Sequence, residues 1–336
     1  MRFLKTLSLA STTFFASITF ANADINVVTS IKPVHSLVSG VMEGVATPDL
    51  IIDTGGSPHT YSLKPSQARQ LQNADIVFWT SPKLEAFLEK PIESIATNAL
   101  VLQLLETEGL LKVNFREGGA FDSHEHEHDE HDEHDEQDEH DKHDKHDEHD
   151  EQDKHDKHDE HHADETDPHI WLDPLNAAIL VSHIADALSD SDPDNKQTYE
   201  ANADAMLAKL DQLVDDVTKE LKPVQDREYI VFHDAYQYFE RRFNVSAIGS
   251  ITVSPEVLPG ADRIRVLQEK VASLDASCVF SEPQFEPRLV STITENTNAG
   301  TGVLDPLGSS IENGPDLYFQ LIRDMSSSLK ECLASD

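Results

Sequence analysis

The sequence predicts an α/β fold of two lobes, each with a mostly parallel sheet flanked by helices, joined by one long rigid helix. Short runs rich in β-branched and apolar residues, such as 25–31, 75–79 and 229–232, alternate with helical patterns. This alternation is typical of βαβ units and a parallel sheet. Between the two alternating regions, residues 193–221 form a helical pattern with almost no breaker. At 1.5 Å per residue this helix would be about 43 Å long, which predicts a strut between two lobes.

The N-terminal half alternates between the two kinds of element. Strands are expected at 25–31, 49–52, 75–79 and 99–102. The intervening helices are expected at 33–39, 66–73 and 83–90, and Ser66 would cap the second of them. A further helix at 176–188 precedes the long helix, for which Asp192 is the expected cap, Pro193 the first residue and Pro223 the terminator.

The alternation resumes after the long helix. Strands are expected at 229–232, 245–251, 278–280 and 301–304, and helices at 261–274, 288–296 and 317–333. The chain therefore divides into an N-terminal lobe at 24–192, a linking helix at 193–222 and a C-terminal lobe at 223–336. Each lobe has enough residues of ordinary composition to bury its own core.

The first residues have the order of a secretory signal peptide. Arg2 and Lys5 precede a largely apolar stretch at 7–20, and an A-x-A motif follows at 21–23. The apolar stretch is short for a membrane span, which needs about 20 residues. We expect residues 1–23 to be removed on export, leaving a protein outside the cytoplasm that is not embedded in the membrane. An uncleaved anchor is the alternative.

An insertion at 122–167 interrupts the N-terminal lobe with a repeat of period three, such as Glu-His-Asp. It holds 24 Asp or Glu residues against four Lys, out of a formal net charge of −37 for the chain. It has almost no aliphatic residue with which to build a core, so we expect it to be disordered. An acidic chain of this kind repels nucleic acid phosphates and anionic lipid.

The insertion is also rich in a metal ligand. An acidic linker is the plain interpretation, but so many imidazoles beside carboxylates favour a metal-collecting role at low affinity, without selecting Zn²⁺, Ni²⁺ or Cu²⁺. The candidate secondary ligands are His124, His126, His128, His131, His134, His140, His143, His146, His149, His155, His158, His161 and His162.

The chain has two cysteines, Cys278 and Cys332. In an oxidising compartment an even pair favours a disulfide, and with two cysteines only one pairing exists. A soft metal site is the alternative, but no His lies close to either thiol in the sequence. The disulfide would close a loop of about 50 residues and stabilise the fold by about 4 kcal/mol on the chain-entropy model.

Four dispersed residues form a candidate metal site. His59 and His169 lie in the loop-like segments 55–61 and 167–174, while His233 and Asp305 end predicted strands. Ligands of open α/β sheets bind near the carboxyl ends of the strands. Three imidazoles and one carboxylate would satisfy a four-coordinate Zn²⁺. Of the remaining histidines outside the insertion, His183 is interpreted as a packing or surface residue, while His35 follows a strand and Pro33 and could line the cleft, although it is not included in the candidate site.

Several segments resemble the periplasmic binding proteins of zinc-uptake ABC transporters. Segments 254–256 and 280–285 look like further signatures of that family, and the motifs follow its order. The three segments that match its metal-ligand motifs are Ser57-Pro58-His59-Thr60-Tyr61, Asp167-Pro168-His169-Ile170-Trp171 and Phe232-His233-Asp234-Ala235-Tyr236.

The resemblance implies two similar lobes with the metal cleft between them and His59, His169 and His233 as ligands. Asp305 matches a carboxylate that ligates the metal in manganese-binding relatives, while in zinc members water can take its place. Those manganese relatives tend to have Glu where this chain has His233, and three nitrogens favour Zn²⁺ over Mn²⁺.

The function implied by the resemblance is capture of Zn²⁺ as a transported ligand. The protein would be a monomer that delivers the ion to an integral membrane permease with a cytoplasmic ATPase. Other periplasmic zinc carriers are further candidate partners. The chain would not be an enzyme.

Three alternatives remain. A manganese- or iron-uptake protein would share the fold, and His233 is the residue that discriminates. A zinc hydrolase would share the three histidines, but the chain has no H-E-x-x-H motif, and nothing ties Glu256 or Glu282 to the metal as a base. A periplasmic metal buffer would use the insertion as its main binding element.

Overall fold

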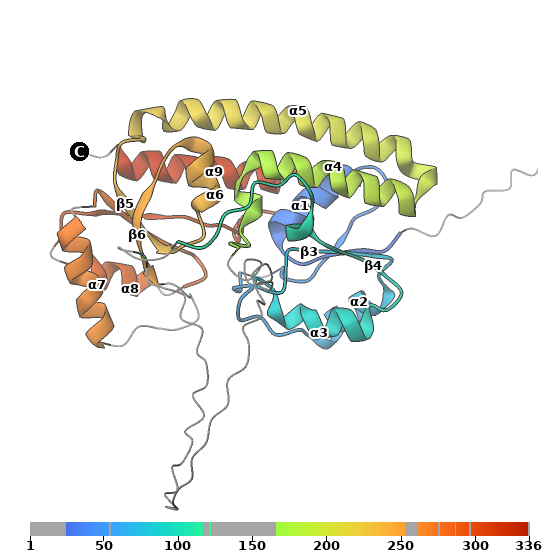
Figure 1. Ribbon diagram of the computed structural model, residues 1–336, viewed down its shortest axis with the longest axis horizontal. Coiled ribbons are helices and arrows are strands. Elements are labelled where there is room, and N and C mark those ends of the chain that lie inside the picture. Colours follow the sequence, from blue (N-terminus) through green and yellow to red (C-terminus); the bar gives the residue numbers. More distant parts are fainter. Residues whose placement is uncertain are drawn as a thin grey trace, which may run out of the picture.

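The computed structural model describes residues 25–53, 55–116, 121, 166–252, 261–274, 276–285, 287–295 and 297–334. The expected signal peptide, the thirteen candidate histidines of the insertion and segment 254–256 lie outside these residues. The described chain forms two α/β lobes side by side, with a long helix running along both of them (Figure 1). The predicted fold class is confirmed.

The sheet of the N-terminal lobe is four-stranded and parallel, in the order β2-β1-β3-β4. Its central strand β3 is apolar and buried at every residue, as expected for a strand covered on both faces. The strands are β1 Val27–Thr29, β2 Asp49–Leu50, β3 Ile76–Trp79 and β4 Leu100–Gln103, and the helices are α1 Lys32–Val41, α2 Pro65–Asn73, α3 Ala86–Ile95 and η1 Leu104–Glu106.

The C-terminal lobe repeats this arrangement with the order β6-β5-β7-β8, also parallel throughout. Numbered within its own lobe, each sheet has the strand order 2-1-3-4, so the two lobes are similar. The strands are β5 Tyr229–His233, β6 Ala247–Thr252, β7 Cys278–Ser281 and β8 Gly300–Val303, and the helices are α6 Gln237–Phe243, α7 Ala261–Leu274, α8 Pro287–Ile293 and α9 Leu317–Leu333.

The predicted strut is α5, Lys196–Leu221. Its 26 residues span about 39 Å, and it lies across α4 (Pro174–Ser191) and α9 on one side of both lobes (Figure 1). The buried residues of α5 recur every three to four positions, from Tyr199 to Leu221, so that one stripe of the helix faces these neighbours.

Several element ends differ from the prediction. Asp192 does not cap the strut: residues Pro193–Asn195 form the 3₁₀ turn η4, and the Asp192 carboxylate accepts from Asn195 and Tyr199 instead. Ser66 is not a cap either, because Pro65 takes the first helical position and Lys64 precedes it.

The predicted helix at 83–90 runs instead from Ala86 to Ile95, with Pro91 inside it. Helix α6 and the 3₁₀ helices η1 and η3 (Ile170–Leu172) were not predicted. A last 3₁₀ turn, η5 Lys222–Val224, follows the strut.

One hydrophobic core extends through both lobes. It contains Val28 and Phe78 from the N-terminal sheet, Val231 and Phe280 from the C-terminal sheet, and buried residues of α1, α4, α5 and α9. The lobes share this cluster instead of burying separate cores. A second, smaller cluster lies between the C-terminal sheet and helices α7 and α8. Because side chains from both lobes pack densely in the main core, this core fixes the position of one lobe relative to the other.

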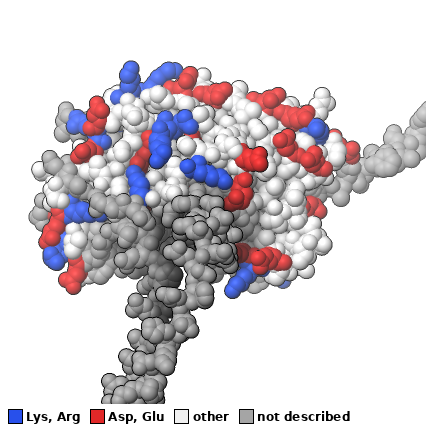
Figure 2. Space-filling model, viewed as in Figure 1, with Lys and Arg blue, Asp and Glu red and all other residues white. Residues whose placement is uncertain are grey.

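The described surface carries both signs of charge. Figure 2 shows acidic side chains gathered over part of α4 and α5 on the face in view, with basic side chains nearer the middle of that face. Among the described residues, no helix has the length and apolar character that a bilayer crossing requires.

The predicted disulfide is present between Cys278 at the start of β7 and Cys332 near the end of α9. It joins the closing helix to the C-terminal sheet, and the two residues are 54 positions apart in sequence. Cys278 is completely buried.

Replacing both cysteines by alanine should lower the free energy of unfolding by about 4 kcal/mol, because the unfolded chain gains the freedom of an open loop. Urea unfolding of the oxidised wild type and the double variant measures this difference. A reductant should destabilise the wild type and leave the variant unchanged. Equal unfolding midpoints for the two oxidised proteins would contradict the prediction.

Candidate metal site

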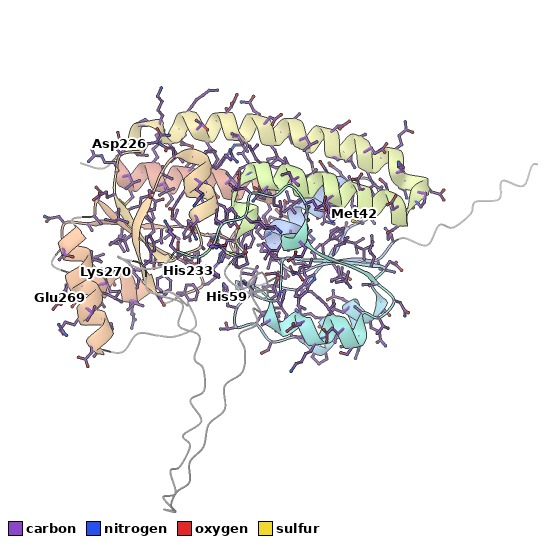
Figure 3. The ribbon with its side chains drawn as sticks, in the orientation of Figure 1. Met42, His59, Asp226, His233, Glu269 and Lys270 are labelled. Carbon is purple, nitrogen blue, oxygen red and sulfur yellow. A yellow bond between two sulfur atoms is a disulfide. The ribbon has the colours of Figure 1, made fainter. Side chains whose placement is uncertain are left out.

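Three predicted histidines from distant parts of the chain meet between the lobes. His59 follows β2 in a turn, His169 immediately precedes η3, and His233 is the last residue of β5. One potential ligand atom from each residue lies within 4.8 Å of those of the other two. The ring centroids of His169 and His233 are 5.3 Å apart, and His59 is 5.8 Å and 6.1 Å from them. Figure 3 shows His59 and His233 near one another in the region between the lobes.

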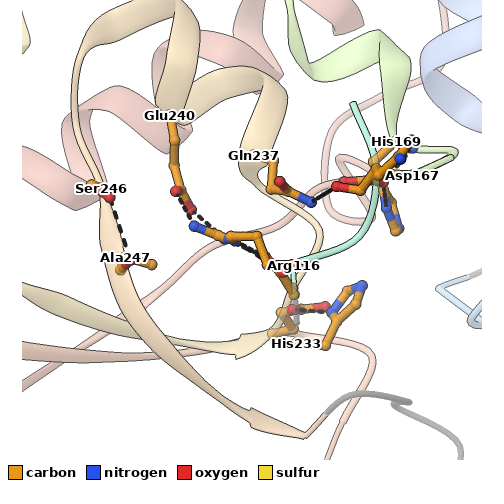
Figure 4. A network of polar contacts seen from close by, with 11 residues as sticks. Arg116, Asp167, His169, His233, Gln237, Glu240, Ser246 and Ala247 are labelled. Carbon is orange, nitrogen blue, oxygen red and sulfur yellow. Dashed lines mark hydrogen bonds and ion pairs between the residues drawn. The ribbon is translucent and has the colours of Figure 1, made fainter. Parts of the chain in front are cut away.

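A buried carboxylate orients the His169 ring. Nδ1 of His169 is 2.7 Å from Oδ1 of Asp167, which also accepts a hydrogen bond from the backbone N–H of His169. Asp167 is completely buried, and its Oδ2 accepts from Gln237 Nε2 in α6 (Figure 4). When Nδ1 donates to this carboxylate, Nε2 presents its lone pair as a metal ligand does.

His233 has the same kind of partner from its own lobe. Its Nδ1 is 2.6 Å from Oε1 of Glu282, which follows β7 and is almost completely buried. Nε2 of His233 is buried and has no hydrogen-bond partner among the described residues. A buried imidazole nitrogen without a partner is costly, and a metal ion is one ligand that satisfies it.

The three rings differ in their affinity for protons. Burial, together with the neighbouring His233, lowers the pKa of His169 to about 3. Burial and the other two rings also lower the pKa of His59 well below its ordinary value. Burial alone would lower the pKa of His233, but the Glu282 carboxylate outweighs it and raises the pKa above the ordinary value. Burial raises the pKa of Asp167 to about 7.

The histidines line a small cavity of about 20 Å³, which has room for one water-sized particle. The cavity walls come from both lobes, and the lining residues are Ser57, Pro58, His59, His169, Trp171, His233, Glu282, Gln284, Pro306 and Leu307.

Asp305 lies outside the group of three histidines. Its Oδ1 accepts hydrogen bonds from Gln284 Nε2 and Leu307 N, and its Oδ2 accepts from the backbone and hydroxyl of Ser309. Both carboxylate oxygens therefore have donors within the protein. The side chain holds the loop after β8, which supplies Pro306 and Leu307 to the cavity wall.

The base of the insertion is bound to the C-terminal lobe. Arg116 donates to both carboxylate oxygens of Asp234, next to His233, and to Glu240 in α6 (Figure 4). The ring of Phe121 lies 4.0 Å from the Arg116 guanidinium. On the other side of the insertion, the backbone carbonyl of Asp167 accepts from Tyr238. Both sides thus contact α6.

Two residues assigned to the insertion belong to the folded structure. Thr166 forms an isolated antiparallel bridge with Asn114, and Asp167 supports His169. His35 does not line the cavity: it is buried, with Nε2 3.1 Å from the carbonyl of Pro48. His183 is half-buried on α4.

Sequence reasoning missed the residues that support the ligands. Asp167 stands two positions before His169, a spacing that could have indicated a hydrogen-bonded pair. Glu282 follows a strand of the same sheet as His233, so the rule that located His233 could also have located its partner. No sequence signal indicated a role for Arg116, because its carboxylate partners Asp234 and Glu240 are more than 110 residues away in sequence.

The fold has two similar α/β lobes, a helix that runs along both of them, and between them a small cavity lined by three histidines. These features define a bilobed solute-binding protein. The family model described as zinc-uptake complex component A, periplasmic (ZnuA), matches residues 27–332. The chain belongs to this family, which consists of substrate-binding transport components and not of enzymes.

Individual relatives agree. The chain is 54% identical over 336 residues to the high-affinity zinc uptake system protein ZnuA of Brucella suis biovar 1 (strain 1330), covering 99% of this chain and all of the relative. It is 36% identical to the protein of the same name from Yersinia pestis over 339 residues, which covers 99% of this chain and 98% of the relative.

Solved structures share the fold. A zinc-bound ZnuA mutant lacking residues 138–173 of its own sequence matches with a TM-score of 0.70 at 21% identity, covering 94% of this chain and 100% of that one. A manganese-bound periplasmic protein from candidatus Liberibacter asiaticus matches with a TM-score of 0.69 at 18% identity, covering 92% and 99%. The fold alone therefore does not determine the metal.

Replacing Arg116 by alanine should lower the free energy of unfolding by about 3 kcal/mol, since it leaves the buried carboxylates of Asp234 and Glu240 without their cation. Urea denaturation measures the loss. Arg323→Ala, which removes an exposed arginine from α9, is the control and should change stability little. Comparable unfolding midpoints for the Arg116 and Arg323 variants would contradict this prediction.

Proposed function

We propose that this chain captures one Zn²⁺ through His59, His169 and His233 and delivers it to an ABC permease for import. The observation that carries the proposal is the convergence of three imidazoles on a cavity with room for one ion. Family membership supports zinc as the transported ligand. A water molecule completes the four-coordinate site in this proposal, because both oxygens of Asp305 already accept hydrogen bonds.

The ligand set favours zinc over manganese. Three nitrogen ligands suit Zn²⁺, whereas Mn²⁺ prefers oxygen-rich sites of higher coordination number. The nearest carboxylates, Asp167 and Glu282, bind the outer nitrogens of the ligand rings instead of facing the same point as the three imidazoles. They increase the basicity of those rings and compensate the charge of the ion.

Binding requires only a small movement. Tetrahedral zinc with bonds of about 2.0 Å places its ligand nitrogens about 3.3 Å apart. The potential ligand atoms lie within 4.8 Å of one another, so they need to approach by no more than about 1.5 Å. The core shared by the lobes is compatible with a change of this size and opposes wide opening.

The cellular location and the delivery step in this proposal are inferred from residues 1–23 and from family membership. We propose that residues 1–23 are a signal peptide and that the mature chain acts in the periplasm as a monomer. The lobes at 24–192 and 223–336, with the linking helix at 193–222 between them, would dock on an integral membrane permease driven by a cytoplasmic ATPase. Other periplasmic zinc carriers remain candidate donors.

The insertion has an accessory role in this proposal. Its thirteen histidines would collect metal at low affinity in a segment that directly precedes Asp167 and His169 in the sequence. The alternative, a buffer in which the insertion is the main metal site, predicts that the cleft is dispensable.

A competitive Zn²⁺ titration separates these functions. The test protein lacks residues 122–165, so that Thr166 and Asp167 keep their folded contacts. We expect one tight zinc site that ignores Mn²⁺ and disappears when His59, His169 and His233 are all replaced by alanine. His35→Ala/His183→Ala is the matched control and should retain the site. Loss of tight binding on deletion of the insertion alone would instead support the buffer.

Acidification should weaken zinc binding, because a protonated imidazole cannot bind the ion. His59 and His169 have lowered pKa values and compete little with protons, whereas the raised pKa of His233 makes it the competing group. Affinity should therefore begin to fall above the ordinary imidazole pKa of about 6.5 and decrease about tenfold per pH unit below the pKa of His233.

Titrations of the deleted protein between about pH 8 and 5 measure this dependence. Glu282→Gln removes the charge that favours the protonated His233 ring, so its affinity should begin to fall at a lower pH. An affinity that is unchanged at about pH 5 would count against a site made of histidines.

A further inference from the structure

Gln284 lines the same cavity as the three histidines. It lies two residues after Glu282, in the turn that follows β7, and so reaches the cavity from the C-terminal lobe together with His233. The proposed function assigns it no role. Its side chain can offer either an oxygen or an NH₂ group, and which of the two faces the cavity determines what it can bind.

Asp305 sets the orientation of this amide. Gln284 Nε2 donates to Asp305 Oδ1 at 3.0 Å. An ionised carboxylate can only accept hydrogen bonds, so the NH₂ group has to face it and the carbonyl oxygen has to face away. Asp305 is itself held by Leu307 N and by the backbone and hydroxyl of Ser309. These donors fix the Asp305 carboxylate, and the carboxylate in turn fixes which end of the Gln284 amide faces it.

The carbonyl oxygen of Gln284 has no partner in the described part of the chain. Oε1 is buried, and no donor among the described residues reaches it. Nε2 of His233, which lines the same cavity, is also buried and without a partner in the described chain. A buried acceptor without a donor is costly, and two orphaned groups at one small cavity indicate that a ligand satisfies both.

The two orphaned groups require different partners. The imidazole nitrogen is a usual ligand of zinc, whereas a neutral amide oxygen is not among its usual ligands and readily accepts a hydrogen bond. A metal ion that carries one water molecule supplies both. The cavity has room for little more than one small particle beside the ligand atoms.

We propose that Gln284 Oε1 accepts a hydrogen bond from the water molecule that completes the coordination of the captured ion. Asp305 is then a positioning residue that acts through Gln284, and it is not a metal ligand. This inference rests on the proposed function and adds to it the means by which the fourth ligand is held. A neutral acceptor at this point selects water over an anion, because chloride or a carboxylate has no proton to donate.

The competing arrangement makes Asp305 the fourth ligand. It would require the carboxylate to exchange hydrogen bonds from Gln284, Leu307 and Ser309 for the metal. It would also release the Gln284 amide from its fixed orientation. The two arrangements differ in one measurable respect: the effect of Asp305 on metal binding depends on Gln284 only in the proposed one.

A double-mutant cycle tests this dependence in the protein that lacks residues 122–165. The variants are Gln284→Met, which has similar length but no acceptor, Asp305→Asn, which can turn the amide around, and the two combined. Zn²⁺ affinity is measured by competition, and the visible absorption of the Co²⁺-loaded protein reports the number and type of ligands. Unfolding of each metal-free variant confirms that it is folded.

We expect each single variant to weaken zinc binding about tenfold and the combined variant to be no weaker than Gln284→Met. The Co²⁺ spectrum of Asp305→Asn should keep its four-coordinate character. An additional loss from Asp305→Asn in the Gln284→Met background, with an altered spectrum, would make Asp305 a ligand and overturn the inference.

Two further results separate this inference from the proposed function. Wild-type affinity in Gln284→Met, together with loss of binding in the triple histidine variant, would reject the inference and leave the zinc receptor in place. Absence of a tight zinc site in the unsubstituted protein would reject both.

Discussion

The histidines of the site come from both lobes, so their meeting depends on how the lobes are held together. Several contacts hold them. Trp171 donates its indole N–H to the carbonyl of Pro306, and Lys32 donates to the carbonyl of Ile311. Arg242 in α6 binds Asp173, whose carboxylate also caps α4. Together with the continuous core, these contacts bring His59 and His169 of one lobe to His233 of the other.

Each side of the site also has its own buried carboxylate. Asp167 and Glu282 stay close to charged or polar partners, which offsets part of the cost of removing them from water. Their position behind the rings is what distinguishes this site from one in which carboxylates bind the metal directly. In the proposed site, the same residues that orient the rings place carboxyl groups just beyond the candidate nitrogen ligands.

Much of the fold could be predicted from hydrophobic periodicity and from residues that typically start or end helices. The helices at 261–274 and 317–333 have the predicted bounds, because their apolar spacing extends to both ends. The prediction ended one helix at Lys90, since proline normally ends a helix, whereas α3 continues past Pro91 to Ile95 and buries Leu88 and Ile92 in the core. Helix α6 was missed because seven residues give too short a pattern.

The three histidines could be predicted because each follows a strand or lies in a recognisable motif. The long-range part of the surrounding network could not. Its members, such as Arg116 and Glu240, pair only after the chain has folded, and local sequence carries no record of contacts over more than 100 residues. The four hydrogen bonds that occupy Asp305 come from partners only two to 21 positions away, but they depend on the final course of its loop.

The bridge between Asn114 and Thr166 places the two sides of the insertion next to each other. A segment inserted at such a point closes a loop whose end-to-end distance is already set by the fold. The free-energy cost of closing a loop grows only with the logarithm of the loop length, by about 0.6 kcal/mol for each doubling. Repeats of the three-residue unit could therefore be gained or lost in evolution at little cost to folding, and the number of histidines in the insertion could change without altering the cleft.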